Sequence, residues 1–490
     1  MLRPNAKADS SAELDAFDAL MGDALASLRQ HIESNSKGEA SATGYAPIRD
    51  IISALEVERW LPTGGMDRDG FQRFLDAYLE HSVRLHHPNY IAHQVGIPDY
   101  PGALAATLNG VLNNPMAIYE MGPSAASLEF VVLNWMLSKV GWTPQPLPDQ
   151  PQDGAHSAGV LTHGGSLANL TGLLAARARV APDAWEKGTP HDLAVLAPRD
   201  CHYSVARAVS ILGLGSDAVV PLDVTRFGVI DPARLPDALA RVRAAGRRPM
   251  ALIANACSTA TGLHDPLRAV GEFCRNEDIW YHVDACHGAT ALLAHGARRH
   301  LDGIELADAV VWDTHKMMQV PVLCAALLLR DHRDFDRAFH QDASYLAFGH
   351  DTQGVDSLPR AIECTKASLG LKIFLTLAFR GEAALGQYVD DRYAMTRRAY
   401  DIINAHPDFH CPYEPETNIL CFAYRNNDAL HKPIRDALVK AGSFHLTSAT
   451  VDRRTLLRIT VMNKHTDEQS IETMLQVIDK QAKALMQEGS

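Results

Sequence analysis

No uninterrupted apolar run in this sequence of 490 residues is long enough to cross a membrane. The longest such run, Val320 to Leu329, is short and contains a proline. The N-terminus, MLRPNAKADSSAELDAF, has no apolar core of the kind found in secretion signals. The eight cysteines include no CxxC pair, so we expect reduced, mostly buried thiols in a chain of this length. These absences predict a cytoplasmic protein without a membrane partner.

Excess positive charge and the common nucleotide-binding motifs are also absent. The chain has 58 acidic and 46 basic residues, which give a formal net charge of -12. Proteins that bind nucleic acids present clustered Lys and Arg instead, so we expect no nucleic-acid partner. Neither GxGxxG nor the P-loop pattern GxxxxGK followed by Ser or Thr occurs. Dinucleotide and P-loop binding therefore lose their main support.

Short apolar runs alternate with helical segments in the middle of the chain, after an N-terminal region with helical patterns only. Alternating strands and helices form right-handed crossovers, a mainly parallel sheet and helices on both of its faces. Residues 386–490 have the pattern of a small α+β domain. The sequence therefore predicts an α/β protein with three parts, at 1–105, 106–385 and 386–490. The candidate strands are 193–198, 217–222, 249–256, 279–285, 307–313 and 323–329.

Two charged residues lie in or directly after apolar strands. Lys316 follows such a strand, where burying a lysine is costly unless it is paired or loses its charge. A Schiff base with an aldehyde cofactor removes that charge, and desolvation lowers the pKa of the amine so that it can react. Asp284 interrupts a buried strand, where a pyridinium nitrogen would be a suitable cationic partner. Simpler roles remain open for both: a lysine that reaches solvent and an aspartate that caps a turn.

Two further motifs lie at the same predicted edge of the sheet. Gly165 and Ser166 begin a helix, whose backbone N–H groups and dipole favour a phosphate, although GGS is also an ordinary helix cap. His202 follows a strand, where its imidazole can stack on a flat cofactor ring or hydrogen-bond within the loop. Because ligands bind at the carboxyl ends of parallel strands, the four signals together indicate one cofactor site.

Four motifs, in this order and spacing, resemble a known family. They are THGGSLAN, HYSVARA, HVDACHGA and WDTHKMM, and together they resemble the group II pyridoxal-phosphate-dependent amino-acid decarboxylases. Within that family the chain is most similar to the glutamate, aspartate and cysteine-sulfinate decarboxylases, over roughly residues 80 to 465. The resemblance implies a fold-type I subunit whose mainly parallel sheet is sandwiched by helices. It also implies a homodimer, formed through the N-terminal helical segment, in which both chains share each active site.

The resemblance implies a cofactor contact for each residue that matches a family motif. Lys316 would carry pyridoxal 5'-phosphate, Asp284 would pair with its ring nitrogen, and His202 would stack on the ring. The further implied contacts are Gly165, Ser166 and His315 at the phosphate and Thr259 near the ring.

Substrate-side residues are implied in the same way. Tyr345, in ASYLAF, matches the loop tyrosine that protonates the substrate carbanion, and Arg458 matches the arginine that faces the substrate α-carboxylate. His93 and Gln94 lie where a carboxylate-recognising glutamine is expected. The predicted reaction releases CO2 and an amine. The predicted catalytic residues are Lys316, Tyr345, His202 and Asp284.

Three positions depart from the family pattern. Asp313-Thr314 stands where the glutamate enzymes usually carry Asn-Pro, and His287 stands where Trp or Tyr is common. Lys366 replaces a frequent arginine, which keeps the charge but loses the bidentate geometry. These changes leave the predicted decarboxylation intact and bear on the identity of the substrate.

Several alternatives remain open at this stage. A small acidic amino acid is the favoured substrate, and 2,4-diaminobutyrate and aromatic amino acids are alternatives. An aminotransferase or another carbon–carbon lyase of the same fold would use the same lysine and aspartate. A cofactor-binding protein without catalysis is disfavoured because every expected catalytic position is filled. A metal-binding regulatory protein would use the neighbouring histidines His81, His86, His87 and His93, but their irregular spacing leads us to expect no metal.

Overall fold

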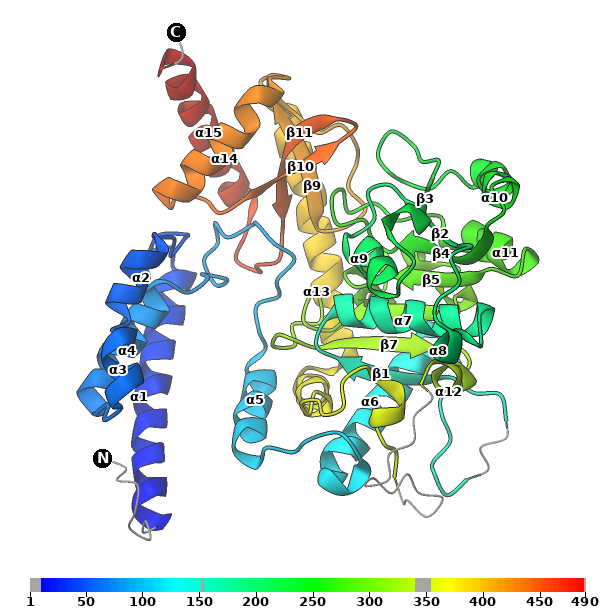
Figure 1. Cartoon of the computed structure of the whole chain (residues 1–490). Helices are drawn as coiled ribbons and strands as arrows, with labels where there is room; N and C mark the ends of the chain where they lie inside the picture. The colour runs from blue at the N-terminus through cyan, green and yellow to red at the C-terminus, as the bar shows by residue number, and fades with distance from the viewer. Residues whose placement is uncertain (1–9, 151–153, 340–353, 489–490) are drawn as a thin grey trace.

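The computed structural model describes residues 10–150, 154–339 and 354–488, which Figure 1 shows in colour. Helices form the N-terminal part and lie along one side of the molecule, where Arg68 on α4 pairs with Asp23 on α1 at 2.5 Å. The helices are α1 (Ser10–Ser36), α2 (Ile48–Ala54), α3 (Val57–Thr63), α4 (Arg68–Glu80) and α5 (Tyr100–Leu112).

A sheet of seven described strands forms the centre of the molecule, in the order β1-β7-β6-β5-β4-β2-β3. Neighbouring strands from β6 to β3 are parallel, whereas β7 runs antiparallel to both β1 and β6. The strands are β1 (Ala158–Thr162), β2 (Leu193–Pro198), β3 (Val219–Leu222), β4 (Arg248–Asn255), β5 (Trp280–Asp284), β6 (Ala309–Asp313) and β7 (Ala325–Leu329).

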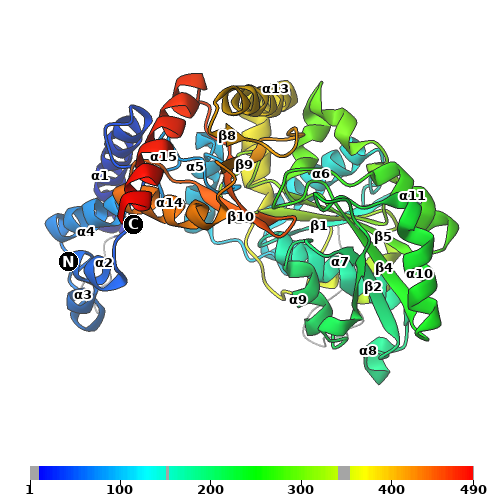
Figure 2. The ribbon, with the colours of Figure 1, turned by 90° about the horizontal axis from the view of Figure 1, so that it is seen from above.

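Helices cover both faces of this sheet, because its strands are apolar on both sides. Along β5, Tyr281 and Val283 pack into one core cluster while Trp280 packs into the other, as the alternation of a pleated strand requires. Figure 2 shows the two helical layers. One layer contains α6 (Pro123–Val140), α10 (Leu235–Ala244) and α11 (Leu267–Asn276); the other contains α7 (Gly165–Val180), α9 (Ser204–Ile211) and α12 (Arg333–Ala338). A short helix, α8, spans Ala184–Lys187.

The C-terminal part is a smaller antiparallel sheet with helices on it. Its strand order is β10-β11-β9-β8. The long helix α13 (Gly370–Ala405) joins the two parts: it bends at Gly381 (φ 75°), and its side chains pack first into the core of the large sheet and then into that of the small one. The other elements are β8 (Phe409–His410), β9 (Ile419–Tyr424), α14 (Asp428–Ala441), β10 (Thr447–Val451), β11 (Arg454–Thr460) and α15 (Glu468–Glu488).

A short N-terminal segment belongs to this C-terminal sheet. Ile91 donates its N–H to the carbonyl of His445 at 2.9 Å, and its own carbonyl accepts from the Thr460 N–H at 2.8 Å. Its side chain is buried in the same apolar cluster as β9 and β11. The small sheet is therefore completed by residues that lie more than half the chain away in sequence.

The predicted α/β fold with a mainly parallel sheet and helices on both faces is confirmed. All six candidate strands are present, with shifts of up to two residues at their ends. The boundary proposed between residues 385 and 386 falls inside α13. No helix in the described parts of the chain is long and apolar enough to span a membrane.

Candidate functional site

The predicted site residues meet at a cavity of about 320 Å³ beside the carboxyl ends of β4, β5 and β6. The turns after β1 and β2 contribute the rest of the wall, so the motifs of the sequence converge as expected for a sheet with parallel strands. The lining residues are His163, Gly164, Gly165, Ser166, Asn169, His202, Asn255, Cys257, Thr259, Asp284, Cys286, His287, Asp313, His315, Lys316 and Leu323.

Lys316 lies in the turn after β6 and points into this cavity together with Asp313. Its Nζ lies 3.0 Å from the Asp313 carboxylate. Burial by itself would lower the pKa of Lys316, but the attraction of Asp313 outweighs it and raises that pKa. The expectation that the pKa of Lys316 is lowered is therefore wrong, because the Asp313 carboxylate stabilises the charged Lys316 ammonium.

Asp284 ends β5 and is buried in the wall of the cavity. One carboxylate oxygen accepts from the Asn169 side-chain amide at 3.0 Å and the other from the Cys286 N–H at 3.2 Å. Burial by itself would raise the pKa of Asp284, but hydrogen bonding with the Cys286 side chain, the charge of Lys316 and the hydrogen bond from the Asn169 side chain lower it. The carboxylate is therefore ionised and ready to face a cationic group.

Asn169 connects three buried polar groups. The sequence alone did not identify this asparagine as a site residue. Its Nδ2 donates to Asp284 and, at 3.0 Å, to the hydroxyl of Ser204, while its Oδ1 lies 2.8 Å from the ring of His282. Asn169 lies four residues after Gly165 on α7, which places both on the same face of the helix. That spacing is the signal that could have identified it.

His202 forms another part of the wall. Its Nδ1 lies 2.8 Å from the Ser204 hydroxyl, which also accepts from Asn169. Burial lowers the pKa of His202, so its ring is neutral at neutral pH. This neutral imidazole, fixed by Ser204, lines the cavity.

The beginning of α7 closes one end of the cavity. Gly164 has a φ of 104°, which favours glycine, and α7 begins at Gly165. A Cβ on Gly165 would lie 2.8 Å from Asp313 Oδ1 and would also overlap the sulfur of Cys286. The backbone N–H groups of Gly165 and Ser166 therefore remain open at a helix N-terminus, which is an anion-binding arrangement.

Two more predicted cofactor residues, His315 and Thr259, also line the cavity. His315 Nδ1 lies 2.7 Å from the carbonyl of Cys324, and its Nε2 lies 3.7 Å from Asp313. The backbone carbonyl of Thr259 accepts from Arg458 Nη2 at 2.8 Å. Thr259 thus separates the cavity from the buried arginine behind it.

Three predicted substrate residues do not line the cavity. Arg458, on β11, is buried and donates to the carbonyls of Thr259, Ala260 and Ala92. The ring of His93 packs edge-on against His445, and the buried Nε2 of Gln94 has no hydrogen bond within the described residues. The predicted residue Tyr345 lies outside the described residues.

The departures from the family pattern have different surroundings. Lys366 is buried away from the cavity and donates to both oxygens of Glu129, at 2.5 and 2.6 Å. His287 lines the cavity, where its Nε2 lies 2.7 Å from Asn418 Oδ1, and burial lowers its pKa to about 3. Asn418 precedes β9, so His287 also links the cavity to the small sheet.

The residues present fit pyridoxal phosphate. The cavity offers a lysine amine, an ionised buried carboxylate, a flat imidazole and a helix N-terminus for a phosphate. Asp313 Oδ1 and His287 Nδ1 are buried without a hydrogen-bond partner in the part of the chain that the structure describes, so polar groups remain for a ligand. The fold and the site together define a pyridoxal-phosphate-dependent enzyme of fold type I.

Comparison with known sequences identifies the family. The pyridoxal-dependent decarboxylase conserved domain matches residues 71–425, and the chain belongs to this family of amino-acid decarboxylases. An acidic amino acid decarboxylase (GADL1) of Mus musculus is 30% identical over 386 residues, 78% of this chain and 68% of that protein. An L-2,4-diaminobutyrate decarboxylase of Acinetobacter baumannii is 26% identical over 483 residues, 94% of this chain and 91% of that protein.

Solved structures share the whole fold. The crystal structure of mouse CSAD matches with a TM-score of 0.86 and 24% identity, over 95% of this chain and 98% of that one. Oryza sativa TDC with PLP and tryptamine matches with a TM-score of 0.87 and 20% identity, over 99% and 100%. The protein is thus a pyridoxal-phosphate-dependent decarboxylase, and its substrate is a separate question.

Proposed function

We propose that the protein removes the α-carboxylate of a small acidic L-amino acid, such as aspartate, glutamate or cysteine sulfinate. The observation that carries this proposal is the lining of the cavity. Among the described residues it contains no aromatic ring of Phe, Tyr or Trp, and Leu323 is its one large aliphatic side chain. A cavity of about 320 Å³ that also holds the cofactor leaves room for a small, polar side chain.

Each residue of the cavity has a distinct task in this proposal. The cofactor supplies an electron sink for the electron pair left at Cα when CO2 departs. Lys316 would hold the cofactor through Nζ, which the Asp313 carboxylate stabilises at 3.0 Å in its charged form. Asp284 would pair with the cofactor ring nitrogen and keep it protonated, and His202 would contact the ring.

Two further residues act on the substrate in this proposal. Tyr345 donates the proton from its hydroxyl to Cα, as the family resemblance implies. Arg458, which lies behind Thr259, binds the substrate α-carboxylate. To do so, its guanidinium must give up at least one hydrogen bond to a backbone carbonyl, such as that of Thr259, and donate to the substrate instead. Two relatives from Mus musculus, each 30% identical, support this substrate class. They are an acidic amino acid decarboxylase (GADL1) and a cysteine sulfinic acid decarboxylase.

A second candidate substrate is 2,4-diaminobutyrate. The buried Asp313 carboxylate has one oxygen without a partner among the described residues, and a carboxylate there suits an amino group on the substrate side chain. The similarity to the diaminobutyrate decarboxylase, over 94% of this chain, supports the same candidate.

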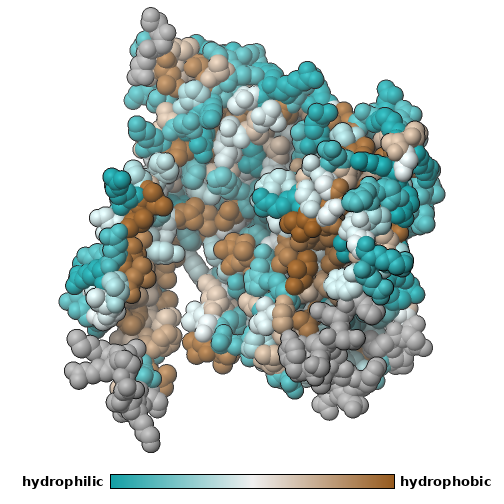
Figure 3. All heavy atoms as spheres, in the orientation of Figure 1, coloured by the Kyte–Doolittle hydropathy of each residue, from teal (hydrophilic) through white to brown (hydrophobic). Residues whose placement is uncertain are grey.

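We also propose that the protein acts as a cytoplasmic homodimer through its N-terminal helices. Apolar side chains gather along α1 in Figure 3, and α5 exposes more of them. The exposed residues on the two helices are Leu14, Phe17, Leu25, Leu28, Leu104, Leu108, Val111 and Leu112. Such surfaces are typical of protein interfaces.

Mass spectrometry of the products tests the proposed reaction. The cofactor-loaded protein is incubated with the twenty standard amino acids, cysteine sulfinate and 2,4-diaminobutyrate. We expect one amine that is lighter than its parent by CO2, formed from an acidic amino acid. A diamine from 2,4-diaminobutyrate would favour the second candidate, and keto acids without amines would contradict decarboxylation. The Lys316→Ala variant should form no product, whereas Lys187→Ala, an exposed lysine on α8, should match the wild type.

A further inference from the structure

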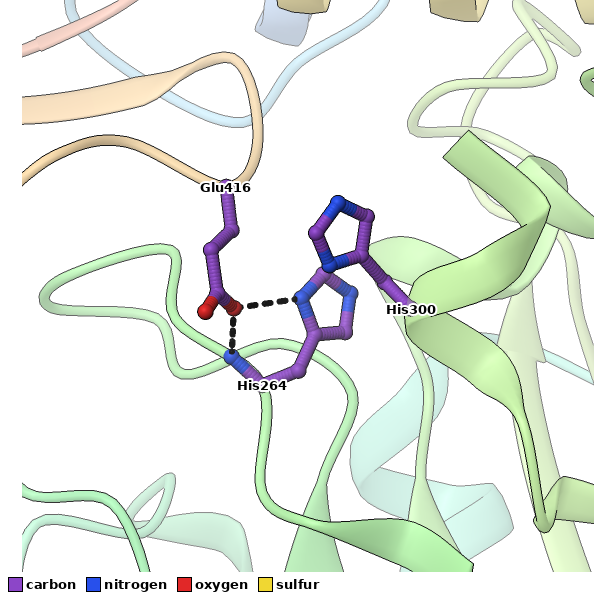
Figure 4. A group of neighbouring side chains, drawn as sticks. All are labelled: His264, His300 and Glu416. Carbon is purple, nitrogen blue, oxygen red and sulfur yellow. Dashed lines mark hydrogen bonds and ion pairs between the residues drawn. The ribbon is translucent and has the colours of Figure 1, made fainter. Parts of the chain in front are cut away.

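Outside the cofactor cavity, two histidines and a glutamate meet between the two sheets. His264 lies in the loop between β4 and α11, His300 lies in the short helix Ala297–Leu301, and Glu416 lies between β8 and β9. Figure 4 shows Glu416 approaching His264 from the small-sheet side while the ring of His300 lies over that of His264. One potential ligand atom from each residue lies within 4.8 Å of the other two.

Hydrogen bonds and stacking hold these side chains in place. The Glu416 carboxylate accepts from the His264 backbone N–H at 2.8 Å and lies 3.1 Å from its ring Nδ1. The rings of His264 and His300 are nearly parallel, with centroids 5.0 Å apart. Glu416 and His264 are therefore held together, and His300 lies beside them, before any ion binds.

The protonation states suit a cation. Burial and the neighbouring His264 lower the pKa of His300 to about 4, so this imidazole is neutral and has a free lone pair. Burial by itself would raise the pKa of Glu416, but the hydrogen bonds from His264 lower it, so the carboxylate is ionised. A neutral imidazole and an ionised carboxylate are the forms in which His300 and Glu416 would bind a metal.

The cluster also contains a ring nitrogen without a hydrogen-bond partner among the described residues. His264 is 4% exposed at its side chain, and its Nε2 has no hydrogen-bond partner among the described residues. Within that same part of the chain, neither ring nitrogen of His300 makes a hydrogen bond. Buried polar atoms normally have partners, so a bound cation is a physical explanation of the unpartnered His264 Nε2.

The distances allow closure around zinc. Tetrahedral zinc with N and O ligands places the ligand atoms roughly 3.4 Å apart, so atoms that lie within 4.8 Å of one another must approach by up to about 1.4 Å. His300 and Glu416 are both partly exposed and can make this adjustment. They border a cavity of about 580 Å³, which leaves a position open for a water as the fourth ligand.

We propose that His264, His300 and Glu416 bind one Zn²⁺ ion that joins the large sheet to the small one. None of the three residues lines the cofactor cavity, so the ion is structural. Glu416 lies two residues before Asn418, whose side chain contacts His287 in that cavity. The ion therefore fixes the segment that positions His287 from the small-sheet side.

Metal titrations of the full-length, cofactor-loaded protein test this proposal. Zn²⁺ binding is measured by calorimetry, and Co²⁺ binding is followed by the ligand-field absorption of a tetrahedral site. We expect one tight site, with affinity lowered at least about 100-fold in His300→Ala and at least about 10-fold in Glu416→Gln. His332→Ala is the matched control, because His332 stacks on His156 in another histidine pair and should leave the affinity unchanged.

The variants also separate binding from folding. Circular dichroism and cofactor absorbance report whether each variant is folded, and Glu416→Gln, which keeps the side-chain shape, decides the question if His300→Ala does not fold. Zn²⁺ should raise the melting temperature of the wild type and of His332→Ala by more than that of Glu416→Gln. Equal affinity in wild type and Glu416→Gln, or no tetrahedral Co²⁺ signal in the wild type, would overturn the proposal.

Discussion

Asn169 is a single side chain on which the electrostatics of the cofactor site depend. It satisfies the Asp284 carboxylate, the Ser204 hydroxyl and the His282 ring at the same time. A buried carboxylate without such donors becomes protonated more easily, because burial disfavours its charged form. Asn169 therefore keeps Asp284 ionised from a position where it need not touch the reacting atoms.

Substitution of Asn169 by alanine tests this dependence. The loss of a buried hydrogen bond to a charged group corresponds to about 1.5–3 kcal/mol, so we expect cofactor affinity to fall by about 10- to 100-fold. Titration of the apoprotein with pyridoxal phosphate measures the effect. The control is Asn134→Ala on α6, whose amide donates to the carbonyl of Gln145 away from the site. Equal affinity in both variants would show that Asp284 does not need this amide.

His282, in the middle of β5, predicts a dependence of stability on pH. Burial lowers its pKa to about 4, whereas in the unfolded chain it is near 6.5. Below pH 6.5 the unfolded chain takes up a proton that the folded protein does not, so stability falls as the pH decreases toward 4. The contribution lost is on the order of 3 kcal/mol.

Urea midpoints measured from pH 7.5 to pH 4, about one pH unit apart, check this prediction for His282. The stability of the wild type should decrease more steeply than that of His282→Asn, which cannot take up this proton. The exposed His295 provides the control, and His295→Asn should retain the wild-type slope. If His282→Asn and the wild type have the same slope, His282 is not the group that titrates.

At the scale of single elements, the N-terminus of α7 requires a residue without a side chain at Gly165. Gly165→Ala places a Cβ against Asp313 and Cys286, so the turn must move and cofactor affinity should fall by at least about tenfold. Gly110→Ala, on the exposed side of α5, meets no atom within 4 Å. It should leave cofactor binding unchanged and stabilise the protein by up to about 1 kcal/mol. Cofactor titration and thermal unfolding of both variants compare the two glycines, and tight binding by Gly165→Ala would contradict this interpretation.

The elements also show which parts of the fold a sequence can predict. The buried strands β2 and β4 to β7 are continuous apolar runs, and the sequence predicts them well. β10, with the sequence TSATV, is polar and only partly buried, and β8 has two residues, so neither has a pattern that stands out.

Some residues of the site can be predicted from local sequence patterns, whereas the positions of others depend on contacts between distant parts of the chain. Lys316, Asp284 and Gly165 follow or end strands, so sheet topology alone brings them together. The position of Arg458 behind Thr259, and the meeting of Glu416 with His264, depend on how the two sheets pack. Packing of that kind leaves no periodic signal in a sequence.

At the scale of the whole molecule, the exposed apolar face of α5 predicts an interface. Leu104, Leu108 and Val111 lie on one face of the helix and are 52%, 41% and 65% exposed. Leu104→Asp combined with Val111→Asp should convert the proposed dimer into monomers in light scattering, because buried unpaired charges are strongly unfavourable. Ala240→Asp with Ala244→Asp, on exposed positions of α10, is the control and should remain dimeric. A wild type that is monomeric would contradict the proposed interface.

The contribution of residues near Ile91 to the C-terminal sheet has a consequence for synthesis on the ribosome. The strand positions that bond to Ile91, His445 and Thr460, are translated more than 350 residues later. Until they emerge, the segment around Ile91 exposes an apolar side chain and unpaired backbone groups to other nascent chains. Translation of nearly the whole message must therefore precede burial of this segment, and a truncated product should require chaperones or be degraded.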